Sequence, residues 1–353
     1  MATAEQNLTA QHVVRALQRG DLPWTLHPEC DYANDPGQWG ASLINHAEVM
    51  VGCLDAAGAT SVVEIGAYAG DLTRFLLGWA SGHGASVAAI DPSPQPELAA
   101  LAQERPELTL IEATSHEALS EMEPADAYVI DGDHNYYTVA EEIRLITAGG
   151  NTPLLLFHDV GWPHGRRDDY FAPEQIPEAS RQPTVEGGGL FPGSSAPQPG
   201  GLPYRWPADH EGGPGNGVLT AVEDFVAEHD GLVLAVVPAF FGLGIVWSKD
   251  APYAQRLADL LRPLDRNPLL ERMEANRAFH LASMHVQLKA IGEAYERLGR
   301  QETVMRRILT SSAFRLAEAL SRLRVRAGVA TGSEAVSREE IERALAPKPP
   351  PSP

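Results

Sequence analysis

The sequence predicts an α/β protein in which a doubly wound, mostly parallel sheet is followed by a long C-terminal helix. From residue 61 to residue 157, short apolar runs alternate with helical patterns of about ten residues, which is typical of βαβ units. Two further runs, at 232–237 and 244–247, lie close together and predict an antiparallel hairpin that ends the sheet. Beyond residue 251, apolar residues repeat at alternating spacings of three and four.

The expected elements follow in chain order. A short helix is expected at 10–18, a turn-rich arm at 23–40 and a helix at 42–57 that ends at Gly58. The first five strands are expected at 61–65, 86–90, 108–112, 125–130 and 153–157, with helices at 71–80, 96–103, 138–147 and 218–228. The domains are then an N-terminal arm 1–45, an α/β domain 46–250, a helical extension 251–327, and a short helix with a disordered Pro-rich tail 328–353.

The helical extension carries a heptad seam. Its members are Leu281, Met284, Leu288, Ile291, Tyr295, Leu298, Met305, Leu309, Leu316 and Leu323. One continuous helix of this length, roughly 60 Å, predicts self-association through a coiled coil, because an isolated seam needs a partner. The alternative is that the helix folds back on its own domain.

Composition excludes several classes of protein. The chain has 353 residues, with 47 Asp and Glu against 27 Lys and Arg, so the net charge of −20 argues against a nucleic-acid partner. Two cysteines, Cys30 and Cys53, form neither a disulfide framework nor a four-thiolate zinc site. Without an apolar window of about 18 residues or a leader-like N-terminus, the expected location is the cytoplasm.

A glycine-rich turn closes the first strand, in the pattern Glu64-x-Gly66-x-x-x-Gly70. The two glycines allow a tight turn and a close approach to a ligand, and the following helix offers free N–H groups. Asp91 ends the second strand, where a carboxylate can accept hydrogen bonds from both hydroxyls of a ribose. The alternative is a purely structural turn beside a solvated Asp.

These residues resemble the class I methyltransferases that use S-adenosylmethionine (SAM), over about residues 45–250. The resemblance implies a Rossmann-like, seven-stranded sheet with SAM as cofactor. It also implies the cofactor-binding residues Glu64, Gly66, Ala67, Tyr68 and Gly70 for the methionine portion, Asp91 for the ribose and Ser115 for the adenine.

Acids and histidines follow the fourth and fifth strands: Asp131, Asp133 and His134 after one, His158 and Asp159 after the other. The carboxyl ends of neighbouring parallel strands meet at one edge of a sheet, so these side chains should converge. Carboxylates so close together repel one another unless protons or a cation intervene. Carboxylate oxygens suit Mg²⁺, and an added imidazole favours Mn²⁺, Fe²⁺ or Zn²⁺.

This constellation resembles a metal-dependent branch of those methyltransferases, the sugar O-methyltransferases and cephalosporin-hydroxylase-like proteins (methyltransferase family 24-like). The resemblance implies that Asp131 and Asp159 bind a divalent metal, most simply Mg²⁺ or Mn²⁺, and that His134 is the catalytic base beside Asp131. His158 departs from the usual acidic residue at its position and is expected to be a third ligand.

The predicted function is therefore SAM-dependent, metal-assisted O-methylation of a sugar hydroxyl in a glycan or glycosylated natural product. Two alternatives stay open: a metal-dependent, hydroxylase-like relative on the same scaffold, and a coiled-coil assembly protein with a degenerate methyltransferase domain.

The Pro- and Gly-rich segment 161–217 is expected to be a functional lid or a disordered loop. With the strand ends it would supply the substrate-binding residues Asp133, Tyr136, Trp162, His164, Arg166, Arg167 and Asn216. Aromatic rings and guanidinium groups suit hydroxylated or anionic acceptors. Residues 300–326, with seven Arg and two Glu, could contact an anionic membrane surface or a glycan-assembly enzyme; the alternative is a solvated helix face.

Overall fold

The computed structural model describes residues 43–329 and 338–345. The predictions for the N-terminal arm, for Cys30 and for the Pro-rich tail lie outside these residues. The chain divides into two units, residues 1–285 and residues 286–353.

The first unit is built on a seven-stranded sheet in the order β3-β2-β1-β4-β5-β9-β8. Its strands are β1 Ser61–Ile65, β2 Ser86–Ile90, β3 Leu108–Ile111, β4 Ala127–Ile130, β5 Leu154–His158, β8 Leu232–Val237 and β9 Leu243–Ser248. The first five are parallel, and β9 pairs antiparallel with both β5 and β8. The predicted fold class, with its terminal hairpin, is confirmed.

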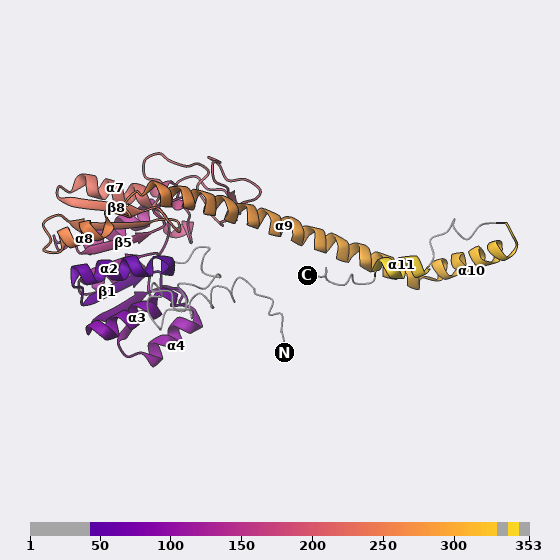
Figure 1. Cartoon of the computed structure of the whole chain (residues 1–353), viewed down its shortest axis with the longest axis horizontal. Coiled ribbons are helices and arrows are strands. Elements are labelled where there is room, and N and C mark those ends of the chain that lie inside the picture. The colour runs from indigo at the N-terminus through magenta and orange to yellow at the C-terminus, as the bar shows by residue number, and fades with distance from the viewer. Residues whose placement is uncertain (1–42, 330–337, 346–353) are drawn as a thin grey trace, which may run out of the picture. The chain divides into compact units, whose positions relative to one another are not determined.

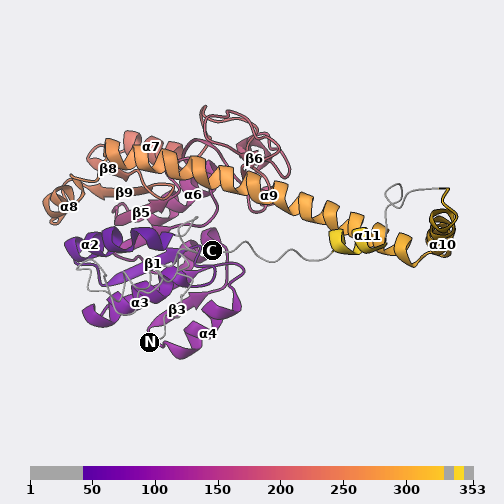
Figure 2. The same ribbon diagram turned by 45° about the vertical axis from the view of Figure 1, so that its right-hand side comes forward.

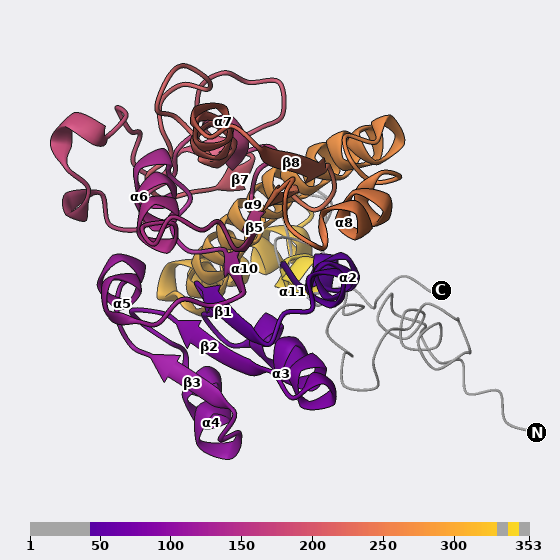
Figure 3. The same cartoon turned by 90° about the vertical axis from the view of Figure 1, so that its left-hand side faces the viewer.

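Helices cover both faces of this sheet (Figure 3). One face carries α2 Ala47–Ala57, preceded by the 3₁₀ turn Leu43–His46, together with α3 Asp71–His83, α4 Pro96–Glu104 and α8 Ala254–Leu261; the other carries α5 Ser115–Glu121, α6 Tyr136–Ile146 and α7 Val218–Glu228. Alternate residues of β5 enter the two cores: Leu154 and Leu156 one, Leu155 and Phe157 the other. Burial on both faces explains why the central strands are continuously apolar in sequence.

Helix α5 was not expected from the sequence, although a signal for it exists. The Thr114 hydroxyl accepts a hydrogen bond from the Glu117 amide, and the Glu117 carboxylate accepts one from the Thr114 amide at 3.2 Å. This reciprocal capping box has the sequence signature of Thr followed three residues later by Glu. It fixes the helix start directly after β3, so Ser115 lies at the carboxyl end of that strand.

The segment 161–217 is folded. It contains three 3₁₀ turns, at His164–Arg166, Pro173–Gln175 and Glu178–Ser180, and a small sheet of β6 Gly189–Leu190 and β7 Leu202–Pro203. Asp168 of this segment is fully buried and accepts hydrogen bonds from the amides of Tyr136 and Gly217 at 2.8 and 2.6 Å. One side chain thus ties this segment to the first turns of α6 and α7.

The C-terminal part is helical, with α9 Pro268–Thr310, α10 Ser312–Arg326 and α11 Arg338–Leu345 (Figures 1 and 2). The expected continuous seam is interrupted. Ser311 adopts an extended conformation (φ −68°, ψ 147°), and its hydroxyl accepts a hydrogen bond from the Phe314 amide at 3.1 Å. Ser311 is therefore an N-cap that ends one helix and begins the next.

The extension also begins later than residue 251. Helix α8 and the first turns of α9 belong to the first unit, where Leu257 and Ala282 are buried. Farther along α9, the seam residues Leu288, Ile291, Tyr295 and Leu298 are at least half exposed. Within the described ranges, no helix has the length and apolar content needed to cross a membrane.

Candidate active site

The glycine-rich turn lies where β1 meets its two neighbours, β2 and β4, at the point where the strand order reverses. Gly66 has φ +86°, and a Cβ atom there would lie 2.1 Å from the backbone oxygen of Asp131. Only glycine therefore lets the turn after β1 approach the turn after β4 this closely. The predicted cofactor turn and the predicted metal ligands are backbone neighbours.

Asp91 connects the glycine turn to the end of β2. Its two carboxylate oxygens accept hydrogen bonds from the amides of Tyr68 at 2.7 Å and Ser93 at 2.8 Å. Each oxygen retains a lone pair, so a ribose diol can still be bound by the same carboxylate. The aromatic side chain of Tyr68 is 65% exposed, beside this carboxylate.

Glu64 is buried beneath the turn rather than open to it. Burial raises the pKa of Glu64 to about 8, so it is protonated near neutral pH. Its carboxyl accepts a hydrogen bond from the Thr73 hydroxyl of α3 at 2.6 Å. Glu64 thus fastens the helix after the turn to β1, a task that the motif alone did not reveal.

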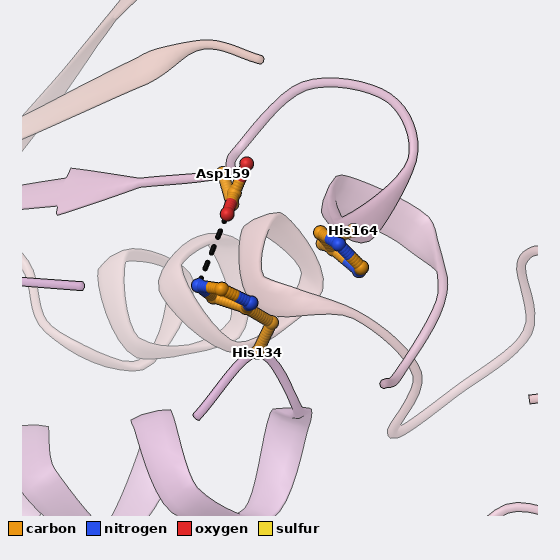
Figure 4. A group of neighbouring side chains, drawn as sticks. All are labelled: His134, Asp159 and His164. Carbon is orange, nitrogen blue, oxygen red and sulfur yellow. Dashed lines mark ion pairs between the residues drawn. The ribbon is translucent and has the colours of Figure 1, made fainter. Parts of the chain in front are cut away.

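The acids and histidines after β4 and β5 do converge. Asp131 Oδ1 lies 2.9 Å from His158 Nδ1 and 3.4 Å from His134 Nε2. Asp159 Oδ2 lies 3.0 Å from His134 Nε2 and 3.6 Å from His158 Nδ1. Figure 4 shows the His134–Asp159 pair, with the Asp159 carboxyl directed at the ring. The two imidazoles therefore bridge the two carboxylates.

Electrostatics make both imidazoles cationic in the metal-free chain. Burial opposes their charge, but Asp159 and Asp131 outweigh it and raise the pKa of His134 to about 10 and that of His158 to about 9. The same imidazoles lower the pKa of Asp131, against its burial. The neutral His134 base expected from the sequence therefore requires another positive charge beside Asp131 and Asp159 to lower its pKa.

Asp131, His158 and Asp159 fit a divalent metal. Each offers one ligand atom, and these atoms lie within 4.8 Å of one another. Asp159 Oδ1 is buried without a hydrogen-bond partner, and its residue adopts φ +58°, which is unusual outside glycine. His158 Nε2 lies 3.0 Å from the backbone oxygen of Phe240. A proton on Nε2 leaves the Nδ1 lone pair for a metal.

A second set shares Asp159 and comprises His134, Asp159 and His164. Figure 4 shows His164 on the loop that follows Asp159. Its ring stacks on that of His134, with centroids 4.9 Å apart and planes inclined by 22°. Imidazole lone pairs lie in the ring plane, so nearly parallel stacked rings do not direct them at one point. In this arrangement the set is less suited to a metal than the first.

Several predicted substrate residues serve the loop instead. Arg167 is buried and donates hydrogen bonds to the backbone oxygens of Ala208 and Ser195. Asn216 is also buried, and its side-chain oxygen accepts from the Asp168 amide at 2.7 Å. These two side chains are committed to holding the segment 161–217 together, which corrects their expected role.

The other predicted substrate residues divide into two groups. Arg166 pairs with Glu223 of α7 at 2.6 Å, and the Tyr136 hydroxyl donates to Asp224 of the same helix at 2.9 Å, so both are directed away from the cluster. Asp133 accepts a hydrogen bond from the Phe171 amide at 3.0 Å.

Of the predicted substrate residues, two aromatic ones remain, His164 and Trp162. His164 packs against His134 and the edge of Tyr204, and Trp162 packs in the small apolar cluster that also includes Tyr204.

Three polar residues near the site, of which His46 and Glu142 are buried, were missed by sequence reasoning. His46, which precedes α2, lies with its ring 6.0 Å from that of His158, and its Nε2 has no hydrogen-bond partner. Burial lowers the pKa of His46 to about 3, so it is neutral. Glu142 of α6 is fully buried, and Glu274 of α9 binds the loop beyond β8. No sequence motif identifies these three residues, because their burial and contacts depend on segments that are distant in the sequence.

Comparison with known proteins supports the class of fold. Residues 63–160 match a family described as a methyltransferase domain, a span that runs from β1 to just beyond β5. No curated protein matches the sequence. The SAH-bound methyltransferase PaMTH1 of Podospora anserina is 16% identical, with 68% of this chain and 88% of that chain covered and a TM-score of 0.36.

Two further structures are similar at the same low level. A putative caffeoyl-CoA O-methyltransferase from Staphylococcus aureus is 12% identical, with 68% and 92% covered and a TM-score of 0.38. Fibrillarin from Aeropyrum pernix, in complex with S-adenosyl-L-methionine, is 11% identical, with 31% and 52% covered and a TM-score of 0.26. The strand order and the family match, rather than these overlaps, identify a Rossmann-like, class I methyltransferase fold.

Proposed function

We propose that this protein is a SAM-dependent O-methyltransferase assisted by a divalent metal. The observation that carries the proposal is the contact between two sites: Gly66 of the cofactor turn lies directly against the backbone of Asp131, one of three clustered metal-ligand residues. A methyl donor in the turn and an acceptor at the metal would therefore be neighbours, as methyl transfer requires.

The donor side consists of the turn after β1, Asp91 at the end of β2 and Ser115 at the end of β3. Asp91 would bind the ribose through its remaining lone pairs, while the amides of Tyr68 and Ser93 keep its carboxylate in place. SAM, when bound, supplies a methyl group on a positively charged sulfur. Ser115 begins α5 and would lie at the adenine edge.

On the acceptor side, Asp131, His158 and Asp159 would hold the metal, which when bound lowers the pKa of an acceptor hydroxyl and fixes its position. His134 then accepts the hydroxyl proton at Nε2, the atom that now pairs with both carboxylates. The hydroxyl oxygen gains the methyl group and the donor leaves as the neutral thioether, so charge and atoms balance. A sugar hydroxyl is the proposed acceptor, because the His164 ring packs against His134 and the Tyr204 ring packs against His164, with Trp162 in the same apolar cluster as Tyr204.

Calorimetry tests the donor site and the metal separately. SAM should bind the wild-type chain, and Asp91→Ala should weaken binding at least tenfold, whereas Glu104→Ala, which removes an exposed acid from α4, should leave it unchanged. Absence of SAM binding, or equal binding by Asp91→Ala, would contradict the proposal. Methyl transfer to a panel of sugar acceptors should stop on addition of EDTA and return with Mg²⁺ or Mn²⁺.

One observation favours the hydroxylase-like alternative. His134, Asp159 and His164 together are two imidazoles and one carboxylate, the donor set typical of non-haem iron oxygenases, although the stacked rings of His134 and His164 would have to turn to bind one ion. Metal analysis of the purified protein separates the two functions. Bound iron without methyl transfer would favour the oxygenase, whereas methyl transfer that is supported by Mg²⁺ would exclude it.

A further inference from the structure

The loop between β8 and β9 is strained and lies against the proposed metal ligands. Two consecutive non-glycine residues in it, Phe240 and Phe241, have φ values of +46° and +66°. Each such conformation costs about 1–2 kcal/mol for an L-amino acid. Interactions from elsewhere in the chain must therefore hold the loop in this shape.

Those interactions come from the first turns of α9. The Glu274 carboxylate accepts one hydrogen bond from the Phe240 amide at 2.8 Å and another from the Phe241 amide at 2.9 Å. Arg277, one turn further along, donates to both oxygens of Glu274 at 2.7 Å. The Arg277 guanidinium also lies over the Phe241 ring, 4.4 Å from its centroid. Glu274 and Arg277 thus bind the backbone and the side chains of the strained loop.

The same loop is hydrogen-bonded to His158. The backbone oxygen of Phe240 lies 3.0 Å from His158 Nε2 and accepts a hydrogen bond from its N–H. The backbone oxygen of Phe241 accepts a hydrogen bond from the Gly161 amide, two residues after Asp159. The Phe240 carbonyl, in the loop that the Glu274 carboxylate holds, therefore fixes the ring orientation of His158. Nδ1 of that ring is directed at Asp131 and Asp159.

We infer that Glu274 is a positioning residue for the metal site, acting through the Phe240 carbonyl on His158. The inference rests on the proposed metal-binding role of Asp131, His158 and Asp159. Partners that orient a ligating imidazole typically change metal affinity by about 10- to 100-fold when they are removed. The C-terminal helix, which contributes no ligand, thus contributes to the affinity of the site.

The test compares three full-length variants. Glu274→Ala removes both acceptors, Glu274→Gln retains one oxygen, and Glu296→Gln is the matched control, since Glu296 pairs with Arg300 in an exposed part of the same helix. Binding of Mn²⁺ and Co²⁺ alone is measured by calorimetry, and the visible spectrum of bound Co²⁺ reports ligand geometry. With metal bound, nitrogen chemical shifts of ¹⁵N-labelled histidine report whether His158 keeps its proton on Nε2.

We expect Glu274→Ala to weaken metal binding about 10- to 100-fold and to alter the Co²⁺ spectrum, with Glu274→Gln intermediate and Glu296→Gln like wild type. Amide hydrogen exchange at Phe240 and Phe241 should accelerate in the Glu274 variants. Wild-type affinity, spectrum and His158 nitrogen shifts in a folded Glu274→Ala variant would overturn the inference. Failure of the wild-type chain to bind either ion would instead overturn the metal site itself, and the two failures are distinguishable.

Discussion

The buried acid Glu142 should make stability depend on pH in a way that one substitution removes. Glu142 lies on α6 with its side chain fully buried. Burial raises the pKa of Glu142 from 4.5 to about 8, although the nearby Ser115 hydroxyl acts in the opposite direction. The folded chain therefore holds a proton here at neutral pH, which the unfolded chain has released.

The sign and size of the effect follow from this difference. Below pH 4.5 the acid is neutral in both states, and its burial costs no ionisation energy. As the pH rises from 4.5 towards 8, the folded state alone retains the proton, so the free energy of unfolding falls by about 1.4 kcal/mol per pH unit. Glu142→Gln cannot ionise. Its stability relative to wild type should therefore rise by up to about 1.4 kcal/mol per pH unit and level off above pH 8.

Urea unfolding followed by circular dichroism at about pH 5.5, 6.5 and 7.5 measures this trend. Glu141→Gln is the matched control on the same helix, because Glu141 pairs with Arg144, which lowers its pKa, so that it titrates below this range. The quantity to compare is the pH dependence of the difference in unfolding free energy between Glu142→Gln and wild type, because the buried Gln amide adds a cost that does not change with pH. If the Glu142→Gln and wild-type curves stay parallel across this range, Glu142 is ionised in the folded chain and the reasoning fails.

Three further predictions concern the site and the C-terminal helix. Gly66→Ala should lower the free energy of unfolding in urea by more than about 3 kcal/mol, because the added Cβ meets backbone atoms. Gly58→Ala, at φ +66° with open space around it, should lower it by about 1 kcal/mol. Equal losses for the two variants would show that the close approach at Gly66 is unimportant. Asp131→Asn should abolish detectable Mn²⁺ binding in calorimetry while SAM binding persists, and retained Mn²⁺ affinity would remove Asp131 from the ligand set. Leu288→Asp combined with Leu298→Asp should convert a self-associated chain into monomers in sedimentation experiments, and a monomeric wild type would contradict the predicted coiled coil.

The strands and the convergence of acidic residues were predictable because both depend on local pattern and simple topology. Five parallel strands were located from apolar runs that burial on both faces makes continuous. Once β4 and β5 are neighbours, Asp131 and Asp159 must emerge at the same edge of the sheet. No knowledge of packing was needed for either step.

The fate of single polar side chains was not predictable, because it depends on how distant segments fold together. Arg167 was expected to bind substrate, yet its guanidinium binds backbone oxygens about 30 to 40 residues further along the chain. The break at Ser311 was likewise hidden by a heptad pattern that continues on both sides of it. A Ser that is compatible with a helix surface becomes an N-cap only when its backbone leaves the helix.

The charges at the site explain why His158 can stand where an acid is usual in the resembled branch. Two imidazoles with raised pKa values face two carboxyl groups, so positive charge on the rings offsets negative charge on Asp131 and Asp159. With a divalent cation and both imidazoles neutral, two carboxylates again balance the charge. A third carboxylate in place of His158 would leave the metal-free cluster with excess negative charge in a buried position, which is costly. If the site binds a metal as proposed, His158 therefore limits the excess negative charge of the cluster, and the loop that Glu274 holds would determine which imidazole nitrogen the metal meets.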